Sequence, residues 1–179
     1  MTPQPREGGR EPASDFDRLR RRVLWSMPTG LYLIGSRWSD RVNLMTANLV
    51  VQVCMEPKLI AAAVESDSVT AGLIESGGGF SVSILARSDK DVVRRFVKPV
   101  TDVEHAPDGS LRCLAGHQVR EEGVARLPVL ASAAGYVICT LTRHEVLGSH
   151  TLFIGEVADV GGEPEDVLRM EDTRMHYGG

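Results

Sequence analysis

Residues 43–57 read NLMTANLVVQVCMEP, and this stretch decides how the chain is expected to fold. Its apolar and β-branched residues, ended by Glu56-Pro57, are typical of a β-strand, which we predict over residues 42–53. Side chains alternate between the two faces of a strand. One face therefore collects only apolar side chains, and we expect it to lie against a core. These side chains are Leu49, Val51, Val53 and Met55.

The opposite face of this strand carries small polar and apolar side chains without any fixed charge. They are Thr46, Asn48, Val50, Gln52 and Cys54. A solvated face would normally carry Lys or Glu, so we expect something to cover this row. From Asn48 to Gln52 the strand rises about 13 Å, which is comparable with a flat tricyclic ring. A second buried sheet face with paired amides explains the row equally well.

Outside this stretch, turn residues divide the chain into many short elements. Residues 1–13 are expected to form a disordered basic tail, followed by one domain over residues 14–179. Ser14 is placed to cap a helix that runs to about Met27. The remaining expected elements are strands over 30–36, 58–64, 80–85, 136–146 and 151–157, a hairpin turn at 39–41, and short helices over 68–75 and 88–96, the second capped by Ser88. Residues 97–134 are expected to be rich in loops, with weak strand signals.

The expected fold class is mainly β with added helices, arranged as an antiparallel barrel, because the strands do not alternate regularly with helices. The glycine cluster at 77–79 follows a helix and precedes a strand. This order is the reverse of the dinucleotide fingerprint, so a nicotinamide would not bind in a Rossmann site. Gly77 is expected to close the preceding helix in the left-handed conformation.

Composition excludes several classes of partner. The chain has 179 residues and a formal net charge of −4, which argues against nucleic acid and acidic membranes. It carries no apolar run of bilayer length and no export signal near its start. Its three cysteines form no C-x-x-C pair, and no two histidines have the spacing of metal ligands. We therefore expect a cytoplasmic protein without a metal site.

The order of several short motifs resembles the flavin reductase-like family, which has the FMN-binding split β-barrel fold. The matching segments are Pro28-Thr29-Gly30, LMTAN at 44–48, Glu56-Pro57, Ser68-Val69-Thr70, GFSV at 79–82, Arg95-Phe96 and GSHTLFIGEV at 148–157. Together they cover most of residues 24–160. The resemblance implies an antiparallel split barrel that binds a flavin.

The resemblance also implies which residues meet the flavin ring. Thr46, Ala47 and Asn48 would line the ring through side-chain and backbone groups. Asn48 stands where the family often has Ser, and Gln52 stands where it has a small hydroxyl residue. Both departures keep hydrogen-bonding capacity and add bulk, so they bear on flavin preference or on the pose of the ring.

Ser68 and Thr70 match the family's phosphate contacts, and they also begin a short helix, whose free amides attract anions. Ser68 acting only as a helix cap is the alternative. The neighbouring Asp67 would repel a phosphate, so a cation is needed nearby. Arg95 and Lys98 are the candidates, unless they form only a solvated basic helix end.

His150 precedes an apolar strand and follows Gly148, which suggests the rim of a pocket. We expect it to contribute to nicotinamide docking or hydride transfer, the alternative being a histidine that only caps a carbonyl. Ser149 replaces the Asp that is common before this histidine in the family. Tyr177 matches a late tyrosine that lies near the flavin in relatives, although it also fits a frayed tail.

The resulting hypothesis is an NAD(P)H-dependent flavin reductase that uses FMN or FAD and takes hydride from NADH or NADPH. The resemblance further implies a homodimer, and a separate monooxygenase as a partner that would consume the reduced flavin. A flavin-binding electron carrier without nicotinamide activity is one alternative. A split-barrel module that binds haem or another cofactor is a second.

Overall fold

The computed structural model describes residues 14–163 and 166–173 of the chain, and contacts divide it into two units. The first unit contains helix α1 (Asp15–Trp25), where the Ser14 hydroxyl accepts the N–H of Asp17 as an N-cap at 3.1 Å. The predicted start of this helix is confirmed, and its end falls two residues before Met27. No residue of α1 is buried, and apolar side chains such as Phe16 and Val23 are exposed.

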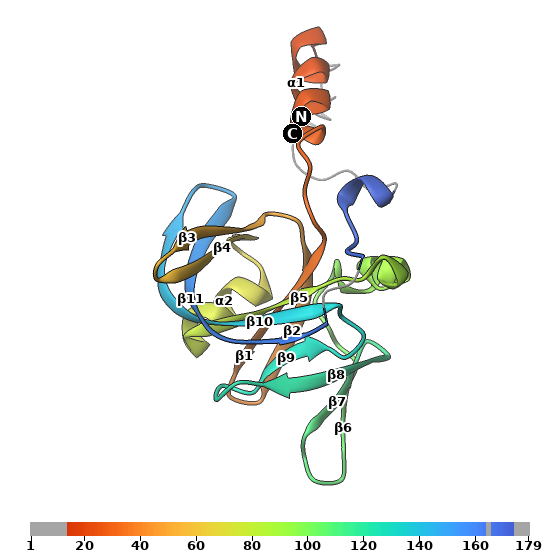
Figure 1. Cartoon of the computed structure of the whole chain (residues 1–179), viewed down its shortest axis with the longest axis vertical. Coiled ribbons are helices and arrows are strands. Elements are labelled where there is room, and N and C mark those ends of the chain that lie inside the picture. The colour runs from red at the N-terminus through yellow and green to blue at the C-terminus, as the bar shows by residue number, and fades with distance from the viewer. Residues whose placement is uncertain (1–13, 164–165, 174–179) are drawn as a thin grey trace, which may run out of the picture. The chain divides into compact units, whose positions relative to one another are not determined.

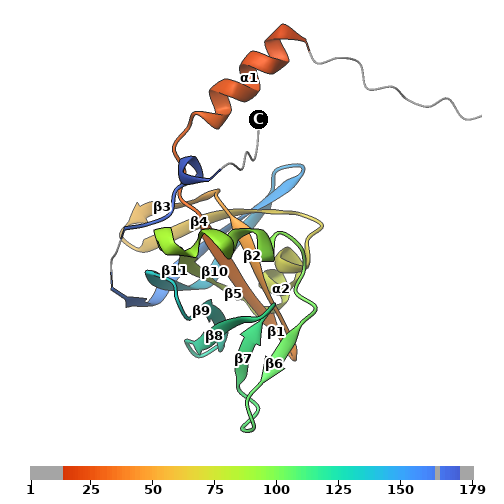
Figure 2. The same cartoon turned by 90° about the vertical axis from the view of Figure 1, so that its right-hand side faces the viewer.

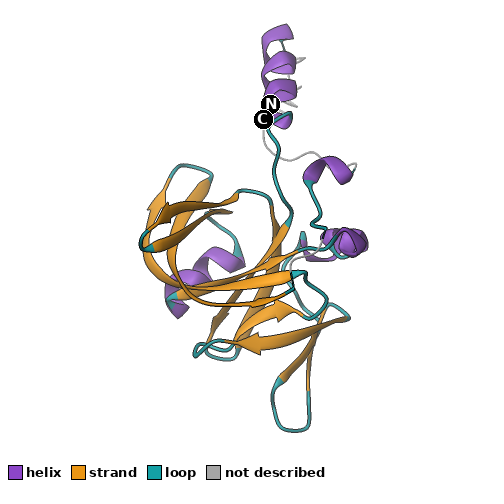
Figure 3. Ribbon diagram, in the orientation of Figure 1, coloured by secondary structure: helices purple, strands orange, loops and turns teal. Residues whose placement is uncertain are grey.

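The second unit, Thr29–Met175, is built on a seven-stranded antiparallel sheet (Figures 1 and 3). The strands, in spatial order, are β2 (Arg41–Ala47), β1 (Tyr32–Trp38), β5 (Gly79–Ile84), β10 (Gly135–Val146), β11 (His150–Gly162), β4 (Lys58–Glu65) and β3 (Val50–Met55). The two edge strands β2 and β3 are joined by Asn48 and Leu49 alone. A connection of two residues cannot cross an open seven-stranded sheet, so the sheet curls until its edges approach each other. The expected antiparallel barrel is confirmed.

Helix α2 (Val69–Gly77) packs against the inner face of this curled sheet (Figure 2). Its Ala71 and Ile74 join a fully buried cluster with Phe80 of β5 and Phe153 of β11. Ser68 caps the helix, since its hydroxyl accepts the N–H of Ala71 at 3.1 Å. The left-handed cap at the other end is Gly78, with φ of +70°, so the assignment of this conformation to Gly77 was wrong.

A second antiparallel sheet occupies residues 103–130, within the segment that was expected to be rich in loops with weak strand signals. It consists of β6 (Val103–His105), β7 (Leu111–Leu114), β8 (His117–Glu122) and β9 (Leu127–Leu130). Leu111, Leu114 and Leu130 from this sheet share a core with Leu33 and Leu44 from the barrel. These strands are short and interrupted by Gly and polar residues, so their alternation was too weak to predict them.

The core that the two sheets share is also covered by two 3₁₀ helices. They are η1 (Arg87–Asp91) and η2 (Val93–Phe96). A single helix over 88–96 capped by Ser88 had been expected, but the N-cap is Ala86 and a kink at Asp89 divides the segment. A third such helix, η3 (Met170–Asp172), follows the last strand.

The predicted strand over residues 42–53 is two strands, and its apolar row does not face a core. Leu49, Val51, Val53 and Met55 are between 42% and 78% exposed. The break at residues 48–49 and a register shift between Gln52 and Cys54 interrupt the alternation on which the prediction relied. The row instead lies on the outside of the edge strand β3.

Candidate functional site

The N-terminus of α2 carries the two residues that were predicted to bind the phosphate, Ser68 and Thr70. Ser68 is half-buried and caps the helix, and Asp67 beside it is exposed. Thr70 has no exposed surface, and its hydroxyl accepts a hydrogen bond of 2.8 Å from the amide of Asn43. The Thr70 hydroxyl therefore cannot offer a direct phosphate contact in this conformation, which corrects the expectation for that residue.

Thr46 of β2 lies under η2. Its hydroxyl donates a hydrogen bond of 2.7 Å to the carbonyl oxygen of Val93. This contact fixes the start of the segment that carries Arg95 and Lys98, both of which are exposed. Neither cation forms an ion pair within residues 14–163 and 166–173. The two side chains are thus available to an anionic ligand.

The connection between β2 and β3 holds the next two predicted residues. Ala47 is buried in the cluster that also holds Phe80 and Phe153. Asn48 is 8% exposed, and its side-chain amide nitrogen lies 3.4 Å from the Thr29 hydroxyl. Gln52 is exposed on β3, where its amide donates to the carbonyl oxygen of Cys54 at 3.1 Å. The polar row predicted along one strand is therefore divided between the strands β2 and β3 and their connection.

His150 begins β11 opposite Glu65, the last residue of β4. Its Nδ1 lies 2.9 Å from the Ser149 hydroxyl. Ser66 links this loop to the turn before α2, because its N–H donates to the Ser149 carbonyl oxygen at 3.0 Å and its hydroxyl lies 3.0 Å from that of Thr151. The structure therefore brings His150 to the same end of the barrel as the start of α2.

Two residues that sequence reasoning missed connect these parts, namely Asn43 and Ser66. Asn43 could have been found, because it shares a strand face with Met45 and Ala47 and is therefore a polar residue in an otherwise apolar row. Ser66 precedes a helix cap in a polar turn, and nothing in the sequence distinguishes it from an ordinary turn residue.

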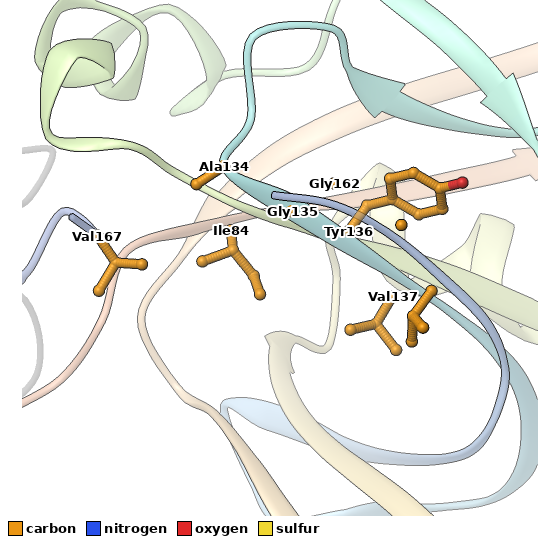
Figure 4. A pocket seen from close by; sticks show the side chains of 9 residues that line it. Ile84, Ala134, Gly135, Tyr136, Val137, Gly162 and Val167 are labelled. Atoms are coloured by element: carbon orange, nitrogen blue, oxygen red, sulfur yellow. The ribbon is translucent and has the colours of Figure 1, made fainter. Parts of the chain in front are cut away.

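A separate apolar pocket of about 440 Å³ lies at the ends of β5, β10 and β11 (Figure 4). Its lining includes Ile84, Tyr136, Val137 and Val167, and it contains none of the predicted site residues. In the sheet register Ile84 lies opposite Tyr32, and Tyr32 lies opposite Ala47, so two strand spacings separate the pocket from the predicted row. The pocket offers an apolar surface without any charge for a phosphate.

Tyr177 lies outside the residues that the structure describes. Among the described residues, no cluster of three or more His, Cys, Asp or Glu side chains has a geometry that could hold a metal ion. None of the described helices has the length and apolar character needed to span a bilayer.

The arrangement suits the binding of a phosphate-bearing ligand. The N-terminus of α2 offers backbone N–H groups and a partial positive charge, and Arg95 and Lys98 lie on a segment that is tied to the neighbouring strand. These cations would offset the repulsion between Asp67 and a phosphate bound at that position.

Comparison with known proteins shows the family of this chain. Residues 24–179 match the model of the flavin reductase like domain. A high molecular weight rubredoxin of Moorella thermoacetica is 30% identical over 152 residues, which are 80% of this chain and 62% of that protein. An NADH-dependent FAD reductase of Streptomyces globisporus is 30% identical over 142 residues, which are 79% of this chain and 74% of that protein.

Among solved structures, the flavin reductase PheA2 in its native state superposes with a TM-score of 0.72 at 26% identity, covering 91% of this chain and 99% of that one. The chain spans about three fifths of the Moorella relative, so that protein has a part without a counterpart here. The family match covers most of the chain and agrees with the curled antiparallel sheet. This chain belongs to the flavin reductase-like family and has its split-barrel fold.

Proposed function

We propose that this protein is an NAD(P)H-dependent flavin reductase, which transfers hydride from NADH or NADPH to FMN or FAD. The observation that carries the proposal is the pair of hydrogen bonds by which Asn43 links the first turn of α2 to the end of the basic segment 93–100, within a chain of this family. The Streptomyces relative is named as an NADH-dependent FAD reductase, which supports the same activity.

The residues present fit a flavin in two parts. The phosphate would be held by the amides at the start of α2 and the Ser68 hydroxyl, with Arg95 and Lys98 supplying positive charge. The ring would lie against the end of β2 and the connection that follows it, with Thr46, Ala47 and Asn48 as the residues nearest to it. A bound flavin supplies the redox chemistry, and the chain binds and orients it.

His150 is proposed to meet the nicotinamide. It stands at the rim of the barrel, and its Nδ1 is oriented by the neighbouring Ser149 hydroxyl. An imidazole N–H in that place can donate to the carboxamide or to a pyrophosphate oxygen of the dinucleotide. Ser149 orients the ring without the negative charge of an aspartate, so we expect His150 to serve in docking.

A homodimer is proposed from the apolar row Leu49, Val51, Val53 and Met55, which is exposed on the edge strand β3. Exposed edge strands with apolar faces are normally covered, and a second copy would cover this one. Light scattering should give twice the chain mass, and Val51→Glu together with Val53→Glu should give a monomer. A wild-type monomer that still binds flavin would refute this proposal.

Reduced flavin would leave for a separate monooxygenase, as befits a reductase component. We also propose a cytoplasmic location, since the three cysteines are free thiols and reducing compartments keep them so. Tyr177 is retained as a proposed ring contact on the family resemblance alone.

Activity is tested by following NADH and NADPH oxidation with FMN, FAD and riboflavin as acceptors. We expect catalytic oxidation of NADH, NADPH or both. The KM for FMN or FAD, which carry a phosphate, should be lower than the KM for riboflavin. A protein that binds flavin but oxidises neither nicotinamide would instead be an electron carrier. A purified protein with a haem spectrum and no affinity for flavin would refute the proposal.

A further inference from the structure

Asn43 is a buried side chain that joins three parts of the molecule. It lies on β2 and is 3% exposed. Its amide nitrogen donates to the Thr70 hydroxyl in the first turn of α2 at 2.8 Å. Its amide oxygen accepts the backbone N–H of Val100 at 2.8 Å. Val100 stands two residues after Lys98, so one side chain connects the helix N-terminus with the basic segment.

The orientation of this amide is fixed by its partners. A backbone N–H can only donate, so the side-chain oxygen of Asn43 must face Val100. The amide nitrogen then has the Thr70 hydroxyl as its acceptor. The nitrogen and the oxygen of the amide each have a hydrogen-bond partner. Because leaving either buried group unpaired costs free energy, these bonds hold the first turn of α2 and the segment at Val100 in place.

Thr46 holds the other end of the same basic segment through Val93. Asn43 and Thr46 are three residues apart on β2, and together they anchor residues 93–100 at both ends. Arg95 and Lys98 lie between these two anchors and are exposed. Their distance from the start of α2 is therefore set by the strand and not by the loop itself.

We propose that Asn43 is a positioning residue for flavin phosphate binding, which holds Arg95 and Lys98 at the right distance from the amides of α2. This inference rests on the proposed function. It assigns no contact between Asn43 and the flavin. It predicts a defect that is confined to flavins with a phosphate, because the ring site at Ala47 and Asn48 does not depend on the Asn43 amide.

The test compares the Kd of FMN with the Kd of riboflavin, which has the same ring and no phosphate. In Asn43→Ala the FMN Kd should rise about tenfold, as expected for a displaced charge-assisted contact, while the riboflavin Kd should change less than about twofold. Equal weakening of both ligands, or no change in either, would overturn the proposal.

Ser36→Ala is the matched control. Ser36 lies opposite Asn43 in the β1–β2 register and is fully buried, and its hydroxyl has no hydrogen-bond partner among the described residues. This substitution perturbs the same part of the core without breaking either connection. Its ratio of FMN Kd to riboflavin Kd should match that of the wild type, and a ratio that rises as in Asn43→Ala would overturn the proposal.

If Asn43→Ala does not fold, Thr70→Val removes only the acceptor of the Asn43 amide and keeps the side-chain shape. The FMN Kd should then rise about fivefold at a constant riboflavin Kd, and an unchanged ratio would overturn the proposal.

Different results would refute the phosphate site and the role of Asn43. A wild-type protein that binds FMN and riboflavin equally would refute the phosphate site itself and this inference with it. A wild-type preference for FMN that is lost in Arg95→Ala but kept in Asn43→Ala would refute the role of Asn43 alone.

Discussion

The hydroxyl of Thr46 donates a hydrogen bond of 2.7 Å to the carbonyl oxygen of Val93. A residue predicted to face a ligand is therefore covered in part by the chain's own 3₁₀ helix. The contact crosses from the barrel to the segment that carries the exposed basic residues. The position of Arg95, two residues after Val93, therefore depends on strand β2.

Thr46→Val keeps the shape of the side chain and removes this hydrogen bond. We expect the free energy of unfolding in urea to fall by about 1 kcal/mol, and the affinity for FMN to fall with it, because η2 loses its anchor. Thr142→Val is the control, since the Thr142 hydroxyl also donates to a backbone oxygen, that of Ile154, at 2.8 Å. The control should lose similar stability and keep its FMN affinity, and a Thr46 variant that behaves in the same way would contradict the assigned role.

His150→Ala should raise the nicotinamide KM or lower kcat about fivefold, as expected for one lost hydrogen bond, and leave the Kd of flavin nearly unchanged. His144→Ala is the control, because His144 is exposed on β10, with its Nε2 3.9 Å from Glu75. Steady-state rates measured over a range of NADH concentrations decide the question. Wild-type kinetics in the His150 variant would leave it a purely structural residue.

Two glycines at the helix α2 should respond to alanine in opposite directions. Gly78 has φ of +70°, a conformation that alanine adopts only with strain, so Gly78→Ala should destabilise the fold by about 1 kcal/mol. Gly72 lies inside the helix, with no atom within 4 Å of an added Cβ, so Gly72→Ala should stabilise it by about 0.5–1 kcal/mol. Thermal unfolding of both variants tests the pair, and shifts of the same sign would contradict the assigned helix end.

Burial raises the pKa of the Cys139 thiol from 9.0 to about 12. At pH 8 the thiolate is then on the order of one part in ten thousand, so Cys139 should react with a thiol reagent only after unfolding. Cys54 is half-buried on β3 and should react in the folded protein. In a chain that also carries Cys113→Ser, Cys54→Ser should abolish that early reaction, and its persistence would contradict the burial of Cys139.

The same pKa difference predicts how stability depends on pH. The unfolded thiol ionises near pH 9 and the folded thiol only near pH 12. The contribution of the neutral Cys139 to stability is therefore complete below pH 9 and is lost as the pH rises towards 12. In Cys139→Ala this part of the alkaline decline should be absent from urea unfolding curves, and an unchanged decline would contradict the shift.

Local chemistry predicted several elements well. Ser14 and Ser68 both cap helices, because a short hydroxyl before an apolar repeat satisfies free amides in the first turn. The hairpin turn after Trp38 is also as expected, with Ser39 at φ of +56°. Caps and turns depend on a few neighbouring residues, so they can be predicted without knowledge of the tertiary structure.

The errors came where packing overrides periodicity. Val51 and Val53 have the composition of a core strand but lie on an exposed edge, which sequence cannot distinguish from a buried one before the neighbours are known. Thr70 was predicted to face a ligand and is turned inward by Asn43, a residue 27 positions away. Contacts between residues so far apart in the sequence depend on strand register, and no local sequence pattern reveals the register.

The measurement that tests the central claim most directly is anaerobic reduction of the flavin. Purified protein loaded with FMN or FAD is mixed with NADH or NADPH, and the visible absorbance of the flavin is followed in time. Hydride transfer predicts complete bleaching with at least one nicotinamide, at a rate far above that of free flavin, and full recovery of the absorbance in air. A flavin that stays oxidised under excess NADH and NADPH would contradict the assignment as a reductase.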